Sequence, residues 1–120
     1  MGTGSGVVRP NFGKAMSSGE ATEAIRERAR GRFDYLWTDK VKQQMAEREL
    51  YDGDILHVLK YGVVSEEGEM STVSGLFKYK MDAPTPNSNN RLVRVVVVVG
   101  RPSILKVCEV TWADEPLGIL

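Results

Sequence analysis

The sequence contains one histidine and one cysteine among its 120 residues, and each scarcity excludes a class of chemistry. A single thiol, Cys108, cannot form an intramolecular disulfide, which fits a chain kept in a reducing cytoplasm. His57 has no cysteine or second histidine near it in the sequence, so a zinc site or a histidine-activated nucleophile lacks the residues it needs. We therefore expect no metal, no cofactor, a cytoplasmic location and an ordinary surface role for His57.

Long hydrophobic runs and nucleotide-binding glycine motifs are also lacking. The longest valine run, Val95 to Val99, is far shorter than the ~20 apolar residues that a membrane helix requires. The start of the chain has no apolar run like that of a signal peptide. Neither G-x-x-x-x-G-K-S/T nor G-x-G-x-x-G is present. We expect no membrane partner and no phosphate-cradling loop.

The chain has no excess of charge of either sign, because its 16 basic and 16 acidic side chains cancel. No field of the whole molecule would attract nucleic acid or an anionic membrane. Locally, residues 38–71 carry four bases and eight acids, a balance of −4, and residues 72–113 carry six bases and two acids, a balance of +4. Opposite charges on the two halves make head-to-tail self-association an option.

Composition divides the chain into an arm, one domain and a short tail. Residues 1–17 are rich in Gly and Ser and cannot bury enough apolar surface to order themselves, so we expect a flexible arm. The 42% hydrophobic content of the 120-residue chain suffices for one core. We predict a single domain over residues 18–114 and a tail over residues 115–120.

Helix-start signals precede an arginine-rich segment. Ser17 and Ser18 offer capping hydroxyls and acids follow in the next turn, which predicts a helix from about Ser18 to Arg30. The arginines near its end, including Arg26 and Arg28, either complement the helix dipole or bind RNA.

The segment from Thr38 to Gly62 predicts two helices joined by a tight connection. Thr38 or Asp39 caps the first helix, Asp52 caps the second, and Gly62 suits the left-handed residue that ends it. Residues 33–37 are too few to distinguish a strand from a helical extension.

Strand patterns follow the helices. Val63 and Val64 form a short edge strand, residues 72–81 alternate in polarity, and residues 82–90 are a loop rich in Pro and Asn. Residues 91–99 are apolar on both faces and belong in the middle of the sheet. Simple alternation sorts the last strand, 104–112, into two faces: Ile104, Cys108, Val110 and Trp112 on one, and Leu105, Val107, Glu109 and Thr111 on the other. The prediction is an α+β domain with N-terminal helices packed on one face of a three- to four-stranded antiparallel sheet.

Cations gather on these predicted strands. Lys78 and Lys80 point to one face about 7 Å apart, Arg91 and Arg94 begin the central strand, and Lys106 lies on its neighbour. Such cations either protect a solvated face from aggregation or bind RNA phosphates.

A family resemblance rests on the helical segment. The order T-x-K-V-x-x-Q-M-x-E-R-E-L-x-x-x-D-I-x-x-x-L-x-x-G in residues 38–62, followed by a valine-rich strand that begins R-L-V-R-V-V-V, resembles a small bacterial domain-of-unknown-function family, number 4258. The match spans Thr38 to about Asp114. Members typically have His, Arg and Gly where this chain has Lys40, Gln44 and Glu49.

In its helices-then-sheet layout that family resembles toxins of the RelE, MqsR and BrnT type, which cleave messenger RNA and are neutralised by an antitoxin protein. The resemblance implies a metal-independent endoribonuclease with two sets of site residues. The catalytic set is Lys40, Arg94 and, if its side chain turns toward them, Tyr79. The RNA-binding set is Lys78, Lys80, Arg91 and Lys106.

A second function stays open beside this one. The chain could be a non-catalytic protein-interaction module, a degenerate toxin-like fold that binds a partner, or a second copy of itself, through its acidic helices or its sheet edge. Glu47 and Arg48 then lock the two helices together.

Overall fold

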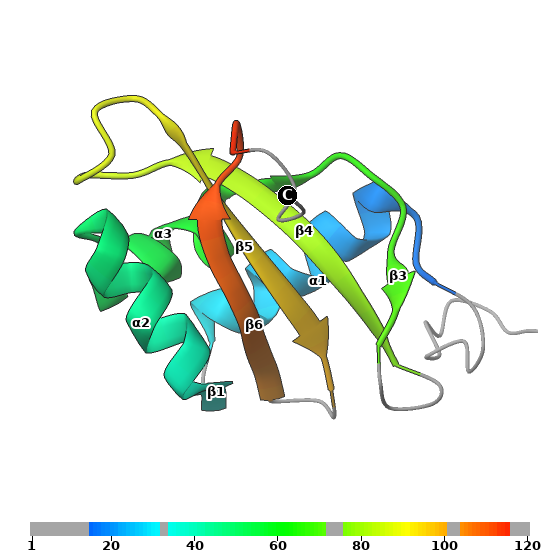
Figure 1. Ribbon diagram of the computed structural model, residues 1–120. Helices are drawn as coiled ribbons and strands as arrows, with labels where there is room; N and C mark the ends of the chain where they lie inside the picture. The colour runs from blue at the N-terminus through cyan, green and yellow to red at the C-terminus, as the bar shows by residue number, and fades with distance from the viewer. Residues whose placement is uncertain (1–14, 32–33, 72–75, 101–103, 116–120) are drawn as a thin grey trace, which may run out of the picture.

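A computed structural model describes residues 15–31, 34–71, 76–100 and 104–115 (Figure 1). The predicted arm lies outside these residues apart from its last three. In chain order the elements are α1 (Ser18–Arg30), β1 (Asp34–Trp37), α2 (Asp39–Arg48), α3 (Asp52–Tyr61), β2 (Val63–Val64), β3 (Glu69–Met70), β4 (Phe77–Pro84), β5 (Leu92–Val99) and β6 (Ile104–Trp112).

The strands form one mixed six-stranded sheet in the order β1-β6-β5-β4-β2, with β3 also paired to β4. The predicted α+β class is confirmed. The expected sheet of three to four antiparallel strands is too small, and it is not wholly antiparallel, because β1 pairs in parallel with β6. The 33–37 segment thus contains a strand.

The core lies between one face of the sheet and the helices α1 and α3. These helices contact each other, and α1 runs behind β4 and β5 in Figure 1. Val93, Val95 and Val97 of β5 point toward the helices and are fully buried, beside Tyr79 and Met81 of β4. Burying one such valine side chain stabilises the fold by about 1.5 to 3 kcal/mol. The predicted central strand, β5, contributes more buried apolar side chains than any other strand of the described residues.

A β-bulge in β6 changes which residues face the core. Val96 pairs with Glu109 and Val97 pairs with Val107, which leaves Cys108 as the extra residue. An extra residue shifts the alternation by one position, so Leu105, Val107 and Val110 all point into the core. The predicted assignment, which put Leu105 and Val107 opposite Val110, is wrong for this reason.

Helix α2 protects the outer edge of β6. Strand β1 covers only residues 104–107 of that edge. Farther along, the amide of Val110 donates to Oε1 of Gln44 at 2.9 Å, and the amide of Trp112 donates to Oε1 of Glu115 at 2.8 Å. Side-chain acceptors thus satisfy edge amides that would otherwise be open to another strand. Unlike α1 and α3, α2 lies beside the sheet edge rather than across the face (Figure 1).

The helix ends follow the predicted signals in part. Ser17 and Glu20 form a capping box, which confirms the start of α1, and the Thr38 hydroxyl accepts from the amide of Val41 at 3.2 Å. At α3, however, the carboxylate of Asp54, not that of Asp52, accepts from the amide of Tyr51.

Gly62 is not left-handed, since its φ is −75°. A Cβ added there would lie 2.6 Å from the carbonyl oxygen of Val58. The position therefore favours glycine because of a close backbone approach, and not because of the predicted conformation.

The arginines of α1 are structural. Arg26 donates to the carbonyls of Gly62 at 2.9 Å and Tyr61 at 3.0 Å, and Arg30 donates to the carbonyl of Lys60 at 2.8 Å. These carbonyls end α3 and lack partners within the helix, so the two side chains cap a neighbouring helix. Of the two predicted alternatives, RNA binding at this end receives no support from these contacts.

One residue of the α2–α3 connection has a backbone that favours glycine. Glu49 has φ 55° and ψ 41°, the left-handed conformation, at the end of α2. Glu49→Gly should raise the free energy of unfolding by about 1 kcal/mol, because glycine adopts this conformation without steric cost. The control Lys42→Gly, at an exposed position within α2, should lower it by about 1 kcal/mol. Urea denaturation measures both, and a destabilised Glu49→Gly variant would contradict the assignment.

Candidate functional site

The sheet face that points away from α1 and α3, called the open face here, carries four of the predicted cations. The register places Lys78 and Lys80 of β4, Arg94 of β5 and Lys106 of β6 on this side, because their neighbours in each strand point into the core. Strand alternation thus brings these side chains together as the sequence predicted.

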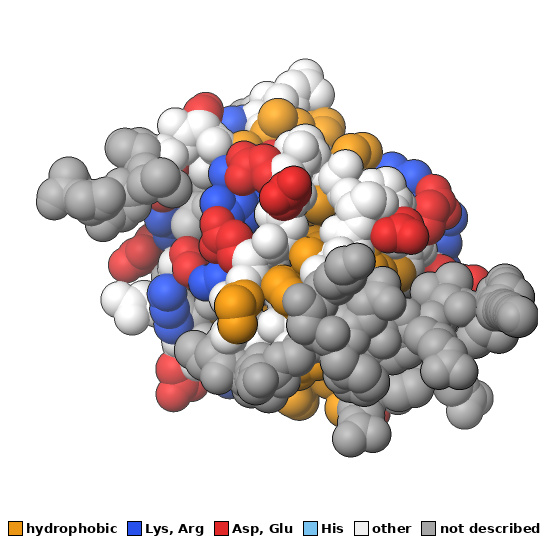
Figure 2. All heavy atoms as spheres, turned by 90° about the vertical axis from the view of Figure 1, so that its right-hand side faces the viewer, with side chains coloured by type: hydrophobic (Ala, Val, Ile, Leu, Met, Phe, Trp, Pro, Cys, Tyr) orange, Lys and Arg blue, Asp and Glu red, His pale blue; other side chains and the backbone are white. Residues whose placement is uncertain are grey.

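Carboxylates accompany two of those cations. Arg94 forms a two-pronged pair with Asp82, at 2.8 and 2.9 Å, and the hydrogen bond to Asp82 raises the pKa of the guanidinium. Lys80 lies 3.5 Å from both Glu66 and Glu69. Figure 2 shows acidic and basic side chains interspersed on the adjoining side of the molecule. A phosphate at Lys80 or Arg94 would have to displace a carboxylate.

The other end of the open face is more basic. Lys78, Val98 and Lys106 lie in one row across β4, β5 and β6. Within the part of the chain that the structure describes, neither lysine forms an ion pair. Lys40, at the start of α2, lies 3.6 Å from Glu109 of β6.

The charges of all three lysines act on the bulge residue Cys108. Burial raises the pKa of its thiol, and the charges of Lys106, Lys78 and Lys40 oppose that rise. We call Lys40, Lys78 and Lys106 the lysine cluster. Two carboxylates lie near it: Glu109 contacts Lys40, and Glu69, which stands opposite Lys78 in the register, is paired with Lys80.

Tyr79 does not join these cations. Its side chain points toward the helices, is 3% exposed, and accepts a hydrogen bond from the amide of Met16 at 2.9 Å through its hydroxyl. Burial raises the pKa of this phenol. A phosphate held on the open face would be out of its reach, so the predicted catalytic set does not converge.

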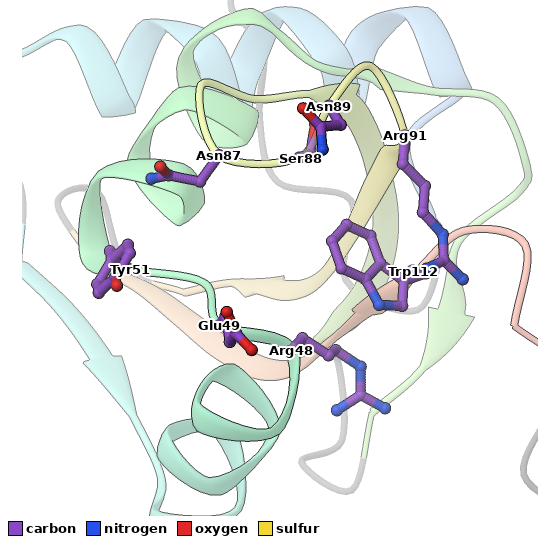
Figure 3. Close-up of a pocket in the computed structure, with 8 residues that line it drawn as sticks. All are labelled: Arg48, Glu49, Tyr51, Asn87, Ser88, Asn89, Arg91 and Trp112. Carbon is purple, nitrogen blue, oxygen red and sulfur yellow. The ribbon is translucent and has the colours of Figure 1, made fainter.

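Arg91 also lies away from the open face. Its guanidinium lies 4.3 Å from the centre of the Trp112 ring and 2.8 Å from a carboxylate oxygen of Asp114. It borders a hollow of about 470 Å³ at the end of β6 (Figure 3). The hollow is lined by Arg48, Glu49, Tyr51, Asn87, Ser88, Asn89, Arg91 and Trp112.

Asp54 ties together the two segments that form this hollow. Its buried carboxylate accepts from the amide of Tyr51 at 2.8 Å, and from the amide and side chain of Asn87 at 3.1 Å. Burial alone would raise the pKa of Asp54, but the nearby Thr85 hydroxyl and the hydrogen bonds from Tyr51 and Asn87 outweigh it and lower the pKa. The α2–α3 connection and the 85–91 loop are therefore held at a fixed separation.

A second long-range interaction, between Arg48 and Glu115, lies at the side of the hollow next to β6. Arg48 donates to both carboxylate oxygens of Glu115, at 2.7 and 2.8 Å, and Glu115 also accepts from the amide of Trp112. Arg48 thus binds Glu115, the first residue of the predicted tail, in addition to Glu47 at 3.3 Å. No local pattern indicates this pairing, because the two partners are 67 positions apart in the sequence.

The described residues contain no group of three His, Cys, Asp or Glu side chains that could hold a metal ion. None of the helices in the described ranges is long and apolar enough to cross a membrane. His57 lies on α3 with its ring centre 4.9 Å from that of Tyr61.

Comparisons with protein-family models, with curated proteins and with solved structures find no significant match. The resemblance drawn from residues 38–62 therefore stays a prediction. The lysine cluster and the hollow are the two features of the described residues that bear on function.

The Glu115 contacts give a pH-dependent contribution to stability. The hydrogen bond from Arg48 is the main cause that lowers the pKa of Glu115 from 4.5 to about 2. Because the folded pKa lies below the unfolded one, this contribution is present above about pH 4.5 and is lost as the pH falls toward about 2. Glu115→Gln should cost about 1 to 2 kcal/mol near neutral pH, a value reduced by partial exposure, and almost nothing at the acid end.

Urea denaturation of the wild type and Glu115→Gln across this pH range measures the difference. Glu47→Gln is the matched control, since Glu47 contacts the same arginine from an exposed position and should cost under about 0.5 kcal/mol. An equal loss in both variants would contradict the assigned role of Glu115.

Proposed function

We propose that the chain is an RNA-binding domain whose lysine cluster contacts phosphates without cleaving the strand. One observation carries this proposal: Lys78 and Lys106 lie in one row at one end of the open face, without an ion pair among the described residues, and Lys40 lies beside that row in contact with Glu109. Phosphate contacts by lysines supply most of the sequence-independent affinity for nucleic acid. A net charge of zero for the whole chain does not oppose this, because the attraction is local.

Binding is better supported than cleavage. Metal-independent cleavage of RNA requires positioned groups that accept and donate protons. Tyr79 is hydrogen bonded on the opposite face, and Arg94 is neutralised by Asp82. Such an arrangement suits a toxin-like fold that has kept RNA affinity and lost catalysis. An antitoxin partner, which the resemblance implies, stays a prediction.

RNA affinity provides the test. Lys78→Ala/Lys106→Ala should weaken binding of a short labelled single-stranded RNA by about tenfold or more, and should reduce the slope of log affinity against log salt by about 1.4. Lys80→Ala is the matched control, because Lys80 lies on the same face but is already paired with Glu66 and Glu69. Fluorescence anisotropy over a salt series measures both quantities.

Equal affinities of the double variant and the control would contradict the proposal. Gel analysis of the same RNA after incubation addresses cleavage separately. Intact RNA is expected, and specific fragments that disappear with Arg94→Ala would restore the endoribonuclease prediction.

An apolar groove favours a second candidate function, self-association. Tyr61, Val63 and Leu92 are 55%, 50% and 46% exposed, and all three line a groove of about 400 Å³ beside the edge strand β2. Exposed apolar groups that gather in one place are typical of interaction surfaces. Head-to-tail association by charge is less well supported, because acidic groups of one half already pair with basic groups of the other within the chain, as Glu66 and Glu69 do with Lys80.

Sedimentation velocity over a concentration series distinguishes these modes. If the groove joins two copies, the wild type should form a dimer that persists at high salt, and Val63→Asp should be monomeric. Leu36→Asp is the control, since Leu36 is equally exposed on the opposite edge strand. A wild type that is monomeric at every concentration would remove this candidate.

A further inference from the structure

The hollow at the end of β6 has the size and the walls of a site for a flat ring. Its volume of about 470 Å³ falls within the roughly 300 to 1,000 Å³ of small-molecule sites. Figure 3 shows Tyr51 and Trp112 on opposite sides of it, with Asn87 and Asn89 on a third side and Glu49 facing them. Tyr51 is 64% exposed, so its ring is available for stacking.

The polar groups that border the hollow have unused hydrogen-bonding capacity. Among the described residues, the Glu49 carboxylate and the Asn89 amide have no hydrogen-bond partner. Asn87 donates from its side chain to Asp54, which leaves its amide oxygen as an acceptor. A ring placed between Tyr51 and Trp112 would therefore meet a carboxylate and two amides at its edges.

The backbone adds an independent sign of function. The described residues include three non-glycine positions with positive φ, and Glu49 and Asn89 line the hollow while Asn90 adjoins it. Asparagine tolerates this conformation, but glutamate does so only at a cost in stability. Strain of this kind gathers at ligand-binding sites, where the side chain is needed at that place.

We infer that this hollow binds a guanine base through the Glu49 carboxylate. Guanine presents two donors side by side, N1–H and the N2 amino group, which match the two oxygens of one carboxylate. Adenine and cytosine present a donor next to an acceptor, and uracil presents one donor between two carbonyls. Each of these bases would therefore place an acceptor opposite a Glu49 carboxylate oxygen, which can only accept. Tyr51 and Trp112 stack on the ring, and the amides of Asn87 and Asn89 contact its remaining edge.

The base, and not its phosphate, is the recognised group. The two arginines at the rim are engaged, Arg91 by Asp114 and Arg48 by Glu115. They therefore offer little attraction to a phosphate. The guanine can belong to a free nucleotide or to an RNA strand. This inference does not rest on the lysine cluster, because the hollow lies at the other end of β6.

Titration calorimetry with GMP and AMP tests the site. The wild type should bind GMP at least tenfold more tightly than AMP, and Glu49→Gln should reduce GMP affinity by about 10- to 100-fold, because the amide replaces one acceptor by a donor. Glu49→Gly should lose the same affinity although its fold is expected to be more stable, so misfolding cannot explain the loss. Glu47→Gln, two positions earlier and outside the hollow, should bind GMP like the wild type.

A second arm identifies the source of the guanine. RNA tetranucleotides that differ only by guanosine or adenosine at one position are titrated against the wild type and Lys78→Ala/Lys106→Ala. Discrimination between GMP and AMP assigns a nucleotide site, and discrimination between the tetranucleotides alone assigns an RNA site. The double variant should discriminate as the wild type does, which separates this inference from the proposed lysine contacts. Equal binding of guanine and adenine in both arms, or full affinity in Glu49→Gly, would overturn it.

Discussion

The burial of β5 on both faces is the constraint on which the rest of the structure depends. Val93, Val95 and Val97 require a layer of helices on one side, and α1 and α3 provide it. On the other side Val96 and Val98 are only 6% and 7% exposed although they point away from those helices. Charged side chains therefore occupy the flanking strands, where long aliphatic stems can shield an apolar neighbour. The need to cover Val96 and Val98 therefore explains part of the positive charge on the open face without any functional role.

The same constraint explains why carboxylates accompany those cations. A guanidinium carried by the buried valine strand itself, that of Arg94, is partly desolvated and requires a fixed partner, which Asp82 supplies from the adjacent strand. Lys106, farther along the face, is exposed to solvent and tolerates the lack of a partner. The ends of the sheet, where fewer side chains are engaged in packing or ion pairs, are therefore better candidates for a functional site.

Local signals in the sequence predicted the local structure well. The start of α1 was predicted because a capping box is encoded within four residues, from Ser17 to Glu20. Alternation in β4 and β5 placed Lys78, Lys80 and Arg94 on one face, and the same rule excludes Tyr79, which lies between two of those lysines. The bulge at Cys108 broke that rule in β6, since the register shift depends on pairing and not on composition.

Long-range contacts could not be predicted in this way. The carbonyls that Arg26 and Arg30 cap lie at least 30 positions away, so the sequence could not decide between a structural role and RNA binding. The parallel pairing of β1 with β6 joins residues about 70 positions apart. The hollow depends on two such ties, Asp54 to Asn87 and Arg48 to Glu115, which is why the run of asparagines predicted only a loop.

The two ends of β6 suit complementary parts of one ligand. Lys106 and Trp112 are six positions apart, roughly 20 Å along a strand, a length that a few nucleotides of single-stranded RNA can span. Phosphate contacts position a strand without reading it, and base contacts read its sequence. When both belong to one rigid sheet, the second contact forms at a high effective concentration once the first is made. A small neutral domain could thereby combine modest local attraction to phosphates with selectivity for one base. The stability lost through the left-handed backbone of Glu49 would be the cost of that selectivity.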